Sequence, residues 1–194
     1  MTAFEWSKAQ TAIEPPAEVY CQTRDMAQAR VERIRVMLEK KGWREEDAAS
    51  ITAIAGELAN NSFDHNLGTW RDLPGCWLEV DIHDREVAVS IADRGQGILS
   101  SLARVRPKLK SHNEALLLAF TEQVTGREPE HRGNGLKFVI RSLNKLSVTS
   151  FFFQTGNAML EFIPPIDAKA LKGYSKSTDK EVSGVFVKMV FKKV

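Results

Sequence analysis

Apolar residues recur at helical spacing in two segments of the first third of the chain. In residues 25–40 the positions that follow this spacing are Met26, Ala29, Ile34, Met37 and Leu38. In residues 45–64 the corresponding face carries Ile51, Ile54, Ala55 and Leu58. The pattern predicts two amphipathic helices, the first ended by Gly42.

Strict alternation replaces this period in residues 77–82 and 87–92. Apolar side chains occupy every second position of both segments, and the polar residues 83–86 lie between them. Such a pattern is typical of a β-hairpin with one buried face and one wetter face.

The second half of the chain predicts a mixture of both elements. A long connection over 99–132 contains a short helix that begins with the capping box of Ser111 and Glu114, and a further helix covers 134–143. Leu116, Leu117, Leu118 and Phe120 make the connection's helix too apolar for solvent, so we expect it to pack on the domain; a partner-docking surface is the alternative.

The remaining segments predict strands and two irregular regions. We expect strands at 146–153, 158–163 and 184–191, with a turn at Gly156 and Asn157 between the first two. The polar, lysine-rich residues 164–183 are expected to form a mobile insertion. Residues 1–22 form an N-terminal arm, for which a short strand around Phe4 to Trp6 is one interpretation.

These elements predict a single domain over residues 1–194, as expected from 194 residues with 43% apolar content. The expected architecture is a two-layer α/β sandwich with a mixed, mostly antiparallel sheet and helices on one face.

A net charge of +2 argues against nucleic acid or anionic membrane as a partner. With no transmembrane run and no signal-peptide pattern, the expected location is cytoplasmic. Cys21 and Cys76 have no metal-ligand or redox spacing and are expected to be packing thiols.

Polar side chains follow the edge of the second helix. Its final turns place four of them within roughly a 100° arc beside the buried stripe: Glu57, Asn61, Asp64 and His65. A carboxylate and a carboxamide one turn apart can hold a water and a hard cation such as Mg²⁺. A solvated helix end is the alternative interpretation.

Two glycine clusters follow. Asp93 shares the parity of the buried residues of its strand and should point inward as an acceptor, while Gly95 and Gly97 allow a close backbone approach. Gly133 and Gly135 precede a helix whose free amides could bind phosphates. Taken singly, each glycine cluster is more typical of an ordinary turn.

Together and in this order, the three clusters resemble the GHKL superfamily of Bergerat-fold ATPases, over about half the chain. The resemblance implies that Glu57 polarises the attacking nucleophile, Asn61 ligates Mg²⁺ and Asp93 accepts a hydrogen bond from the adenine amine. It also implies that residues 99–132 form an ATP lid. Further ATP-binding positions implied by the resemblance are Asp64, His65, Gly95, Gly97, Ile98, Arg132, Gly133, Asn134, Gly135 and Leu136.

The resemblance does not select one activity. With neither a transducer domain nor a phosphoacceptor helix, the chain is most similar to stand-alone serine/threonine kinases of the anti-sigma type, which act on a small regulatory protein, and His65 favours this branch. Asp64 instead favours an ATPase whose hydrolysis is linked to homodimerisation. A nucleotide-gated binding module with negligible catalysis is the third possibility. A zinc enzyme or a nucleic-acid binder would need a ligand cluster or a basic face that the sequence lacks.

Overall fold

The computed structural model describes residues 1–11, 13–66, 68–122 and 134–194. In chain order its helices and strands are α1 (Ala3–Lys8), β1 (Tyr20–Cys21), α2 (Arg24–Lys40), α3 (Glu45–Asn66), β2 (Cys76–Ile82), β3 (Glu86–Asp93), α4 (Gly97–Ala103), α5 (His112–Thr121), α6 (Gly135–Leu143), β4 (Val148–Phe162), the 3₁₀ helix η1 (Ala168–Tyr174) and β5 (Ser175–Lys192). The two helices and the hairpin predicted in the first half of the chain are confirmed, with bounds shifted by at most two residues.

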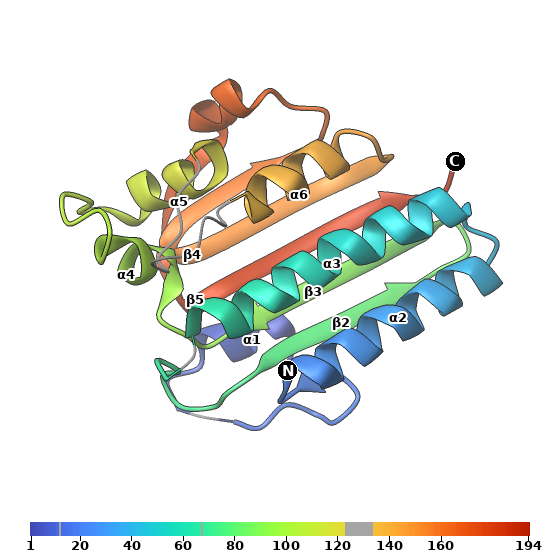
Figure 1. Cartoon of the computed structure of the whole chain (residues 1–194), viewed down its shortest axis with the longest axis horizontal. Helices are drawn as coiled ribbons and strands as arrows, with labels where there is room; N and C mark the ends of the chain where they lie inside the picture. The colour runs from blue at the N-terminus through green and yellow to red at the C-terminus, as the bar shows by residue number, and fades with distance from the viewer. Residues whose placement is uncertain (12, 67, 123–133) are drawn as a thin grey trace.

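The five strands form one open sheet in the order β1-β2-β3-β5-β4 (Figure 1). Every strand pairing in the described residues is antiparallel, so the sheet is not mixed. The chain is a two-layer α/β sandwich, as the sequence predicts.

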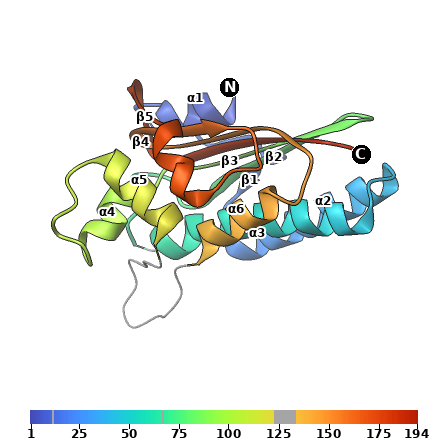
Figure 2. The ribbon, with the colours of Figure 1, turned by 90° about the horizontal axis from the view of Figure 1, so that it is seen from above.

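Helices cover both faces of the sheet unequally. Of the described helices, α2, α3 and α6 lie on one face and α1 lies on the other (Figure 2). The prediction of helices on one face is therefore wrong for the N-terminal arm, and so is the strand considered around Phe4. The segment is a helix rather than a strand because a capping box starts it. The Thr2 hydroxyl accepts a hydrogen bond from the Glu5 amide at 3.2 Å, and the Glu5 carboxylate accepts one from the Thr2 amide at 2.8 Å.

The main core lies between the sheet and its larger helical layer. Helix α3 contributes Ile51, Ile54 and Ala55, which are fully buried. Helix α5 starts at the predicted cap, where the Ser111 hydroxyl accepts from the Glu114 amide. Its Phe120 ring is buried against Phe153, with ring centroids 5.1 Å apart. The prediction that this helix packs on the domain is confirmed.

Two predictions for the C-terminal half are wrong. Gly156 and Asn157 form no hairpin turn; β4 runs through them, because the left-handed φ of 53° at Gly156 allows a bulge in the β4–β5 ladder. Residues 164–183 are not an irregular insertion, since η1 and the first half of β5 lie there. Ser175 and Ser177 pair with β4, so two long strands extend the sheet as a ribbon.

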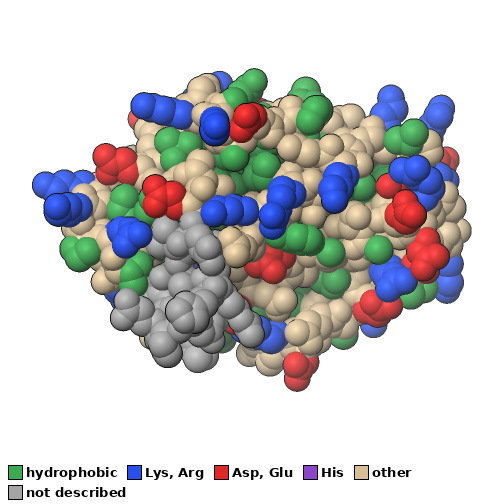
Figure 3. All heavy atoms as spheres, turned by 45° about the horizontal axis from the view of Figure 1, so that its top comes forward, with side chains coloured by type: hydrophobic (Ala, Val, Ile, Leu, Met, Phe, Trp, Pro, Cys, Tyr) green, Lys and Arg blue, Asp and Glu red, His purple; other side chains and the backbone are tan. Residues whose placement is uncertain are grey.

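The predicted lid over 99–132 contains two helices rather than one, α4 and α5, and its end lies outside the described residues. Among the described helices none has both the length and the apolar character to cross a membrane. Basic and acidic side chains are interspersed over the face shown in Figure 3.

Candidate functional site

A cavity of about 510 Å³ lies between α3, the sheet and the α4–α6 side of the molecule. Ten of the predicted site residues line it: Glu57, Asn61, Asp64, His65, Asp93, Gly97, Ile98, Asn134, Gly135 and Leu136. Described residues of all three clusters therefore contribute to one cavity. Gly95 does not line this cavity, and Arg132 and Gly133 lie outside the described residues.

Asp93 ends β3 at the base of the cavity and is 3% exposed. Its Oδ1 accepts hydrogen bonds from the Gly95 amide at 2.9 Å and from Asn66 Nδ2 at 3.1 Å, and its Oδ2 accepts from the Ser62 hydroxyl at 3.2 Å. Burial raises the pKa of Asp93 to about 6, although these hydrogen bonds oppose the shift. The side chain is a buried, oriented acceptor, as predicted.

Asn66 fixes the loop that follows Asp93. Its carboxamide donates to Asp93 and accepts from the Gln96 amide at 3.0 Å. Gly95 lies directly against it, because a Cβ added at Gly95 would come within 1.9 Å of Asn66 Cγ. Gly95 therefore acts through packing on the end of α3 rather than by lining the cavity.

The loop then turns into α4 at Gly97, whose φ of 73° is left-handed. The next amide, that of Ile98, donates to Thr155 Oγ1 at 3.1 Å. Thr155 in turn donates to the Gly184 carbonyl at 3.0 Å, which attaches the loop to β4 and β5. The position of Asp93 thus depends on both α3 and the far strands.

Glu57 lies at the other end of the cavity, against the first residue of α6. A Cβ added at Gly135 would come within 1.9 Å of Glu57 Oε1, so only glycine allows this approach. Among the described residues no side chain caps the N-terminus of α6, where Asn134 is the N-cap. The amides of this first turn and the helix dipole therefore remain available to an anionic ligand beside the Glu57 carboxylate.

Asn61 lines the cavity one turn beyond Glu57, and within the described residues its carboxamide has no hydrogen-bond partner. A free carboxamide oxygen next to a carboxylate suits Mg²⁺, which binds through one or two side chains and otherwise keeps water and phosphate ligands. The described residues contain no group of three or more His, Cys, Asp or Glu side chains arranged to hold a metal. Glu57 and Asn61 are oxygen donors of the kind that Mg²⁺ accepts beside water and phosphate ligands.

The remaining two polar residues of the strip have protein partners. Asp64 forms an ion pair with Arg24 at the start of α2, and both line the cavity. His65 Nδ1 lies 3.2 Å from the Ser101 hydroxyl of α4. These contacts connect the end of α3 to α2 on one side and to the predicted lid on the other.

Sequence reasoning missed three polar residues that shape the site: Arg24, Ser62 and Asn66. Ser62 and Asn66 lie four residues apart on α3, on the face that meets β3. This spacing was available in the sequence, but helix periodicity alone does not reveal which strand residue such a pair will meet.

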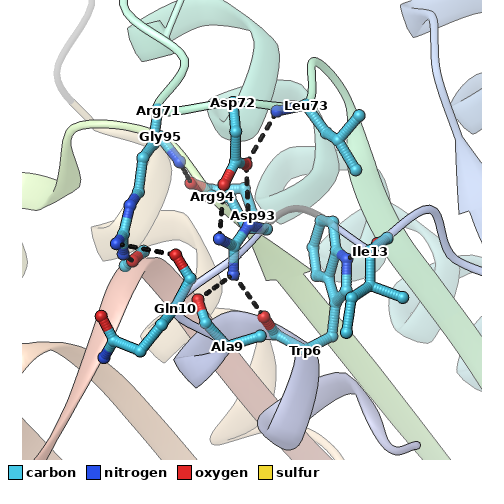
Figure 4. A network of polar contacts seen from close by, with 11 residues as sticks. Trp6, Ala9, Gln10, Ile13, Arg71, Asp72, Leu73, Asp93, Arg94 and Gly95 are labelled. Atoms are coloured by element: carbon cyan, nitrogen blue, oxygen red, sulfur yellow. Dashed lines mark hydrogen bonds and ion pairs between the residues drawn. The ribbon is translucent and has the colours of Figure 1, made fainter.

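Arg94 forms a second polar network on the opposite face of the sheet (Figure 4). The side chain is fully buried; its Nε and Nη2 donate to the two Asp72 oxygens at 2.8 and 2.5 Å. Its Nη1 donates to the carbonyls of Trp6 at 2.6 Å and Ala9 at 2.9 Å, at the end of α1. Because Arg94 follows Asp93 directly, the loop that positions the cavity's acceptor also holds the N-terminal arm.

Neither protein-family models nor curated proteins yield a match to this chain.

Proposed function

We propose that the cavity binds ATP with Mg²⁺ and that the protein transfers the γ-phosphoryl group to a serine or threonine of a small regulatory protein. The single observation that carries this proposal is that each end of the cavity holds its own set of polar groups. One end holds a buried carboxylate suited to an exocyclic amine, and the other holds Glu57, Asn61 and the start of α6, which no described side chain caps. The volume of about 510 Å³ is in the range of small-molecule sites.

At the base of the cavity, Asp93 would accept from the adenine amine. The walls above it include apolar side chains from three strands, Ile91, Phe153 and Val187, which exclude water from a flat base. Ser62, Asn66 and the Gly95 amide already orient the carboxylate, so binding would require little rearrangement there.

At the phosphate end, the α6 amides would hold the phosphate oxygens and Glu57 would orient the attacking hydroxyl. Phosphoryl transfer depends mostly on positioning and on neutralising charge, and Mg²⁺ on Asn61 would supply part of that neutralisation. His65, whose position favours the kinase branch of the resemblance, lines the same cavity.

Binding is tested by titrating ATP and Mg²⁺ into the wild type and Asp93→Asn in a calorimeter. Loss of one charge-assisted hydrogen bond should weaken affinity by about 1.5 to 3 kcal/mol. Asp81→Asn, on an exposed side chain of β2, is the matched control and should bind as the wild type does. Equal affinities for all three proteins would show that the base pocket is misassigned.

Transfer is tested with γ-labelled ATP and proteins captured in the presence and absence of nucleotide, followed by phosphosite mapping. Glu57→Gln should abolish labelling while leaving ATP affinity nearly unchanged. Glu45→Gln, in the exposed first turn of the same helix, should keep full labelling. Phosphate release without any labelled protein would indicate an ATPase, and labelling that survives Glu57→Gln would remove the proposed role of Glu57.

A further inference from the structure

Three residues on neighbouring strands lie in one row at the cavity end of the sheet. Cys21 of β1 pairs with Cys76 of β2, and Cys76 pairs with Asp93 of β3. Directly opposed residues of antiparallel strands project from the same face, here the face covered by α2 and α3. The two thiols, 55 positions apart in the chain, are therefore neighbours, and the row ends at the carboxylate of the proposed nucleotide site.

The pairing geometry suits a disulfide. Opposed Cα atoms in an antiparallel pair lie about 4.5 to 5.5 Å apart, and disulfides join Cα atoms separated by about 4.4 to 6.8 Å. Both cysteines are free and buried. The two opposed residues are therefore within range of a disulfide, and forming the bond draws them closer together.

The two thiols differ in reactivity. A hydrogen bond from the Cys76 thiol lowers the pKa of Cys21, opposed by burial and assisted by the Arg30 charge. The same hydrogen bond raises the pKa of Cys76 well above its usual value, together with burial and the charges of Cys21 and Asp93. These directions agree with the position of Cys21 on the outermost strand of the sheet, and we take Cys21 as the thiol that reacts first and Cys76 as the resolving thiol.

Cys21 becomes accessible to an oxidant when the edge of the sheet opens locally. β1 is only two residues long and is the outermost strand, so its pairing with β2 is a small unit that can open locally. When β1 is paired with β2, its backbone packs tightly against Gly75, since a Cβ added at Gly75 would come within 2.3 Å of the Cys21 carbonyl oxygen. Any change in the distance between Cys21 and Cys76 must therefore move the start of β2, next to Asp93.

We propose that Cys21 and Cys76 are a redox-modification site: a small-molecule disulfide such as oxidised glutathione converts them to a cross-strand disulfide, which displaces Asp93 and weakens nucleotide binding. The effect on nucleotide rests on the function proposed above. In the first step the Cys21 thiolate attacks one sulfur of the oxidant and releases one glutathione thiolate. The Cys76 thiol, after losing its proton to solvent, then attacks the Cys21 sulfur and releases the second glutathione, so two thiols are oxidised and one disulfide is reduced.

The experiment compares the same wild-type protein reduced, oxidised in glutathione disulfide, and reduced again. Bond formation is measured as the loss of two hydrogen atoms in the intact mass and as a peptide linking Cys21 to Cys76 after digestion. The backbone amide resonance of Gly95, which donates to Asp93 Oδ1 at 2.9 Å, reports the position of Asp93 without any nucleotide. Cys21→Ala and Cys76→Ala are controls that cannot form the bond, and the reduction cycle provides the comparison should either variant fail to fold.

We expect the linked peptide, a shifted Gly95 amide and ATP affinity weaker by about tenfold in the oxidised protein, all reversed on reduction. Absence of the linked peptide would overturn the proposal, as would a disulfide that leaves the Gly95 resonance unchanged. A shifted Gly95 resonance with unchanged ATP affinity would overturn the effect on nucleotide binding. If neither form binds ATP, the proposed function fails, and the peptide and the Gly95 amide still test the modification site.

Discussion

At the scale of single residues, Asp93 combines a site role with a cost to the fold. Its pKa of about 6 exceeds the value of about 3.9 in an unfolded chain, so the native state holds the proton more tightly. The free energy of unfolding should therefore fall as pH rises from about 4 to about 6, and the loss by pH 8 should be about 2 to 3 kcal/mol. The ionised carboxylate therefore lowers the free energy of unfolding at neutral pH.

Asp93→Asn tests this directly. The amide oxygen can still accept from Gly95 and Asn66, but the variant carries no buried charge. We expect it to be about 2 kcal/mol more stable than the wild type at pH 8 and similar to it at pH 4, measured by urea unfolding at several pH values. A stability difference that stays constant with pH would contradict the assignment. If the variant is more stable but binds ATP less tightly, the weaker binding results from the lost carboxylate and not from misfolding.

Gly135 makes a second prediction at this scale. The Cβ of Gly135→Ala would come within 1.9 Å of Glu57 Oε1 and must displace that carboxylate. A displacement of about 1 Å can reduce turnover about a hundredfold, so labelling of the acceptor protein should fall by one to two orders of magnitude.

Gly56→Ala is the matched control, one residue before Glu57 on the same helix. Its Cβ would meet only Val31 Cγ1 at an ordinary 3.8 Å. The substitution should leave labelling unchanged and stabilise the helix by about 0.5 to 1 kcal/mol. Similar labelling by both alanine variants would show that the position of Glu57 against α6 is unimportant.

At the scale of elements, Arg94 connects α1 to the loop after β3. Removing Asp72, which lies at the surface, leaves the fully buried Arg94 guanidinium without its carboxylate partner, and such a loss typically costs about 3 to 5 kcal/mol. The Arg94 guanidinium also lowers the pKa of Asp72, so this contribution is present above the unfolded pKa of Asp72 and is lost as pH falls through its lower folded pKa.

We therefore expect Asp72→Asn to speed hydrogen exchange of the α1 amides. Without its carboxylate partner the Arg94 guanidinium is less firmly positioned, which weakens its hydrogen bonds to the Trp6 and Ala9 carbonyls. Arg94→Met with Asp72→Leu should be less destabilising than the sum of the two single changes, since no unpaired charge remains. Additive effects in urea unfolding would mean that the two side chains do not act as a pair. Arg35→Met with Glu39→Leu, an exposed pair on α2, is the control and should be close to additive.

At the scale of the whole molecule, sequence periodicity predicted those elements that bury one face. Helix α3 and the β2–β3 hairpin were placed correctly because each has a continuous apolar stripe. Residues 175–181 of β5 were not recognised as strand, because most of them are exposed and carry no alternation to detect. Helix α1 was missed because six residues contain too few positions for a helical period, although its Thr2–Glu5 capping box was visible.

The candidate site shows the same limit. Asp93 was predicted to point inward from strand parity alone, which depends only on local geometry. Asn66, the Arg94–Asp72 pair and the row of Cys21, Cys76 and Asp93 depend on which elements meet across the fold, and chain spacing carries no such information. Local chemistry was therefore predictable, whereas the residues that orient it were not.

The two faces of the sheet should separate stability from binding. Trp6 is fully buried on the α1 face against Trp77, with ring centroids 6.1 Å apart, whereas Leu58 is buried on the other face and lines the cavity. Trp6→Ala and Leu58→Ala should cost about 3 to 5 and about 2 to 5 kcal/mol respectively, measured by urea unfolding. Below the unfolding transition, only Leu58→Ala should weaken ATP binding, because the cavity loses an apolar wall there. Weakened binding in Trp6→Ala as well would mean that packing of α1 reaches the cavity through Arg94, and that the two layers do not act independently.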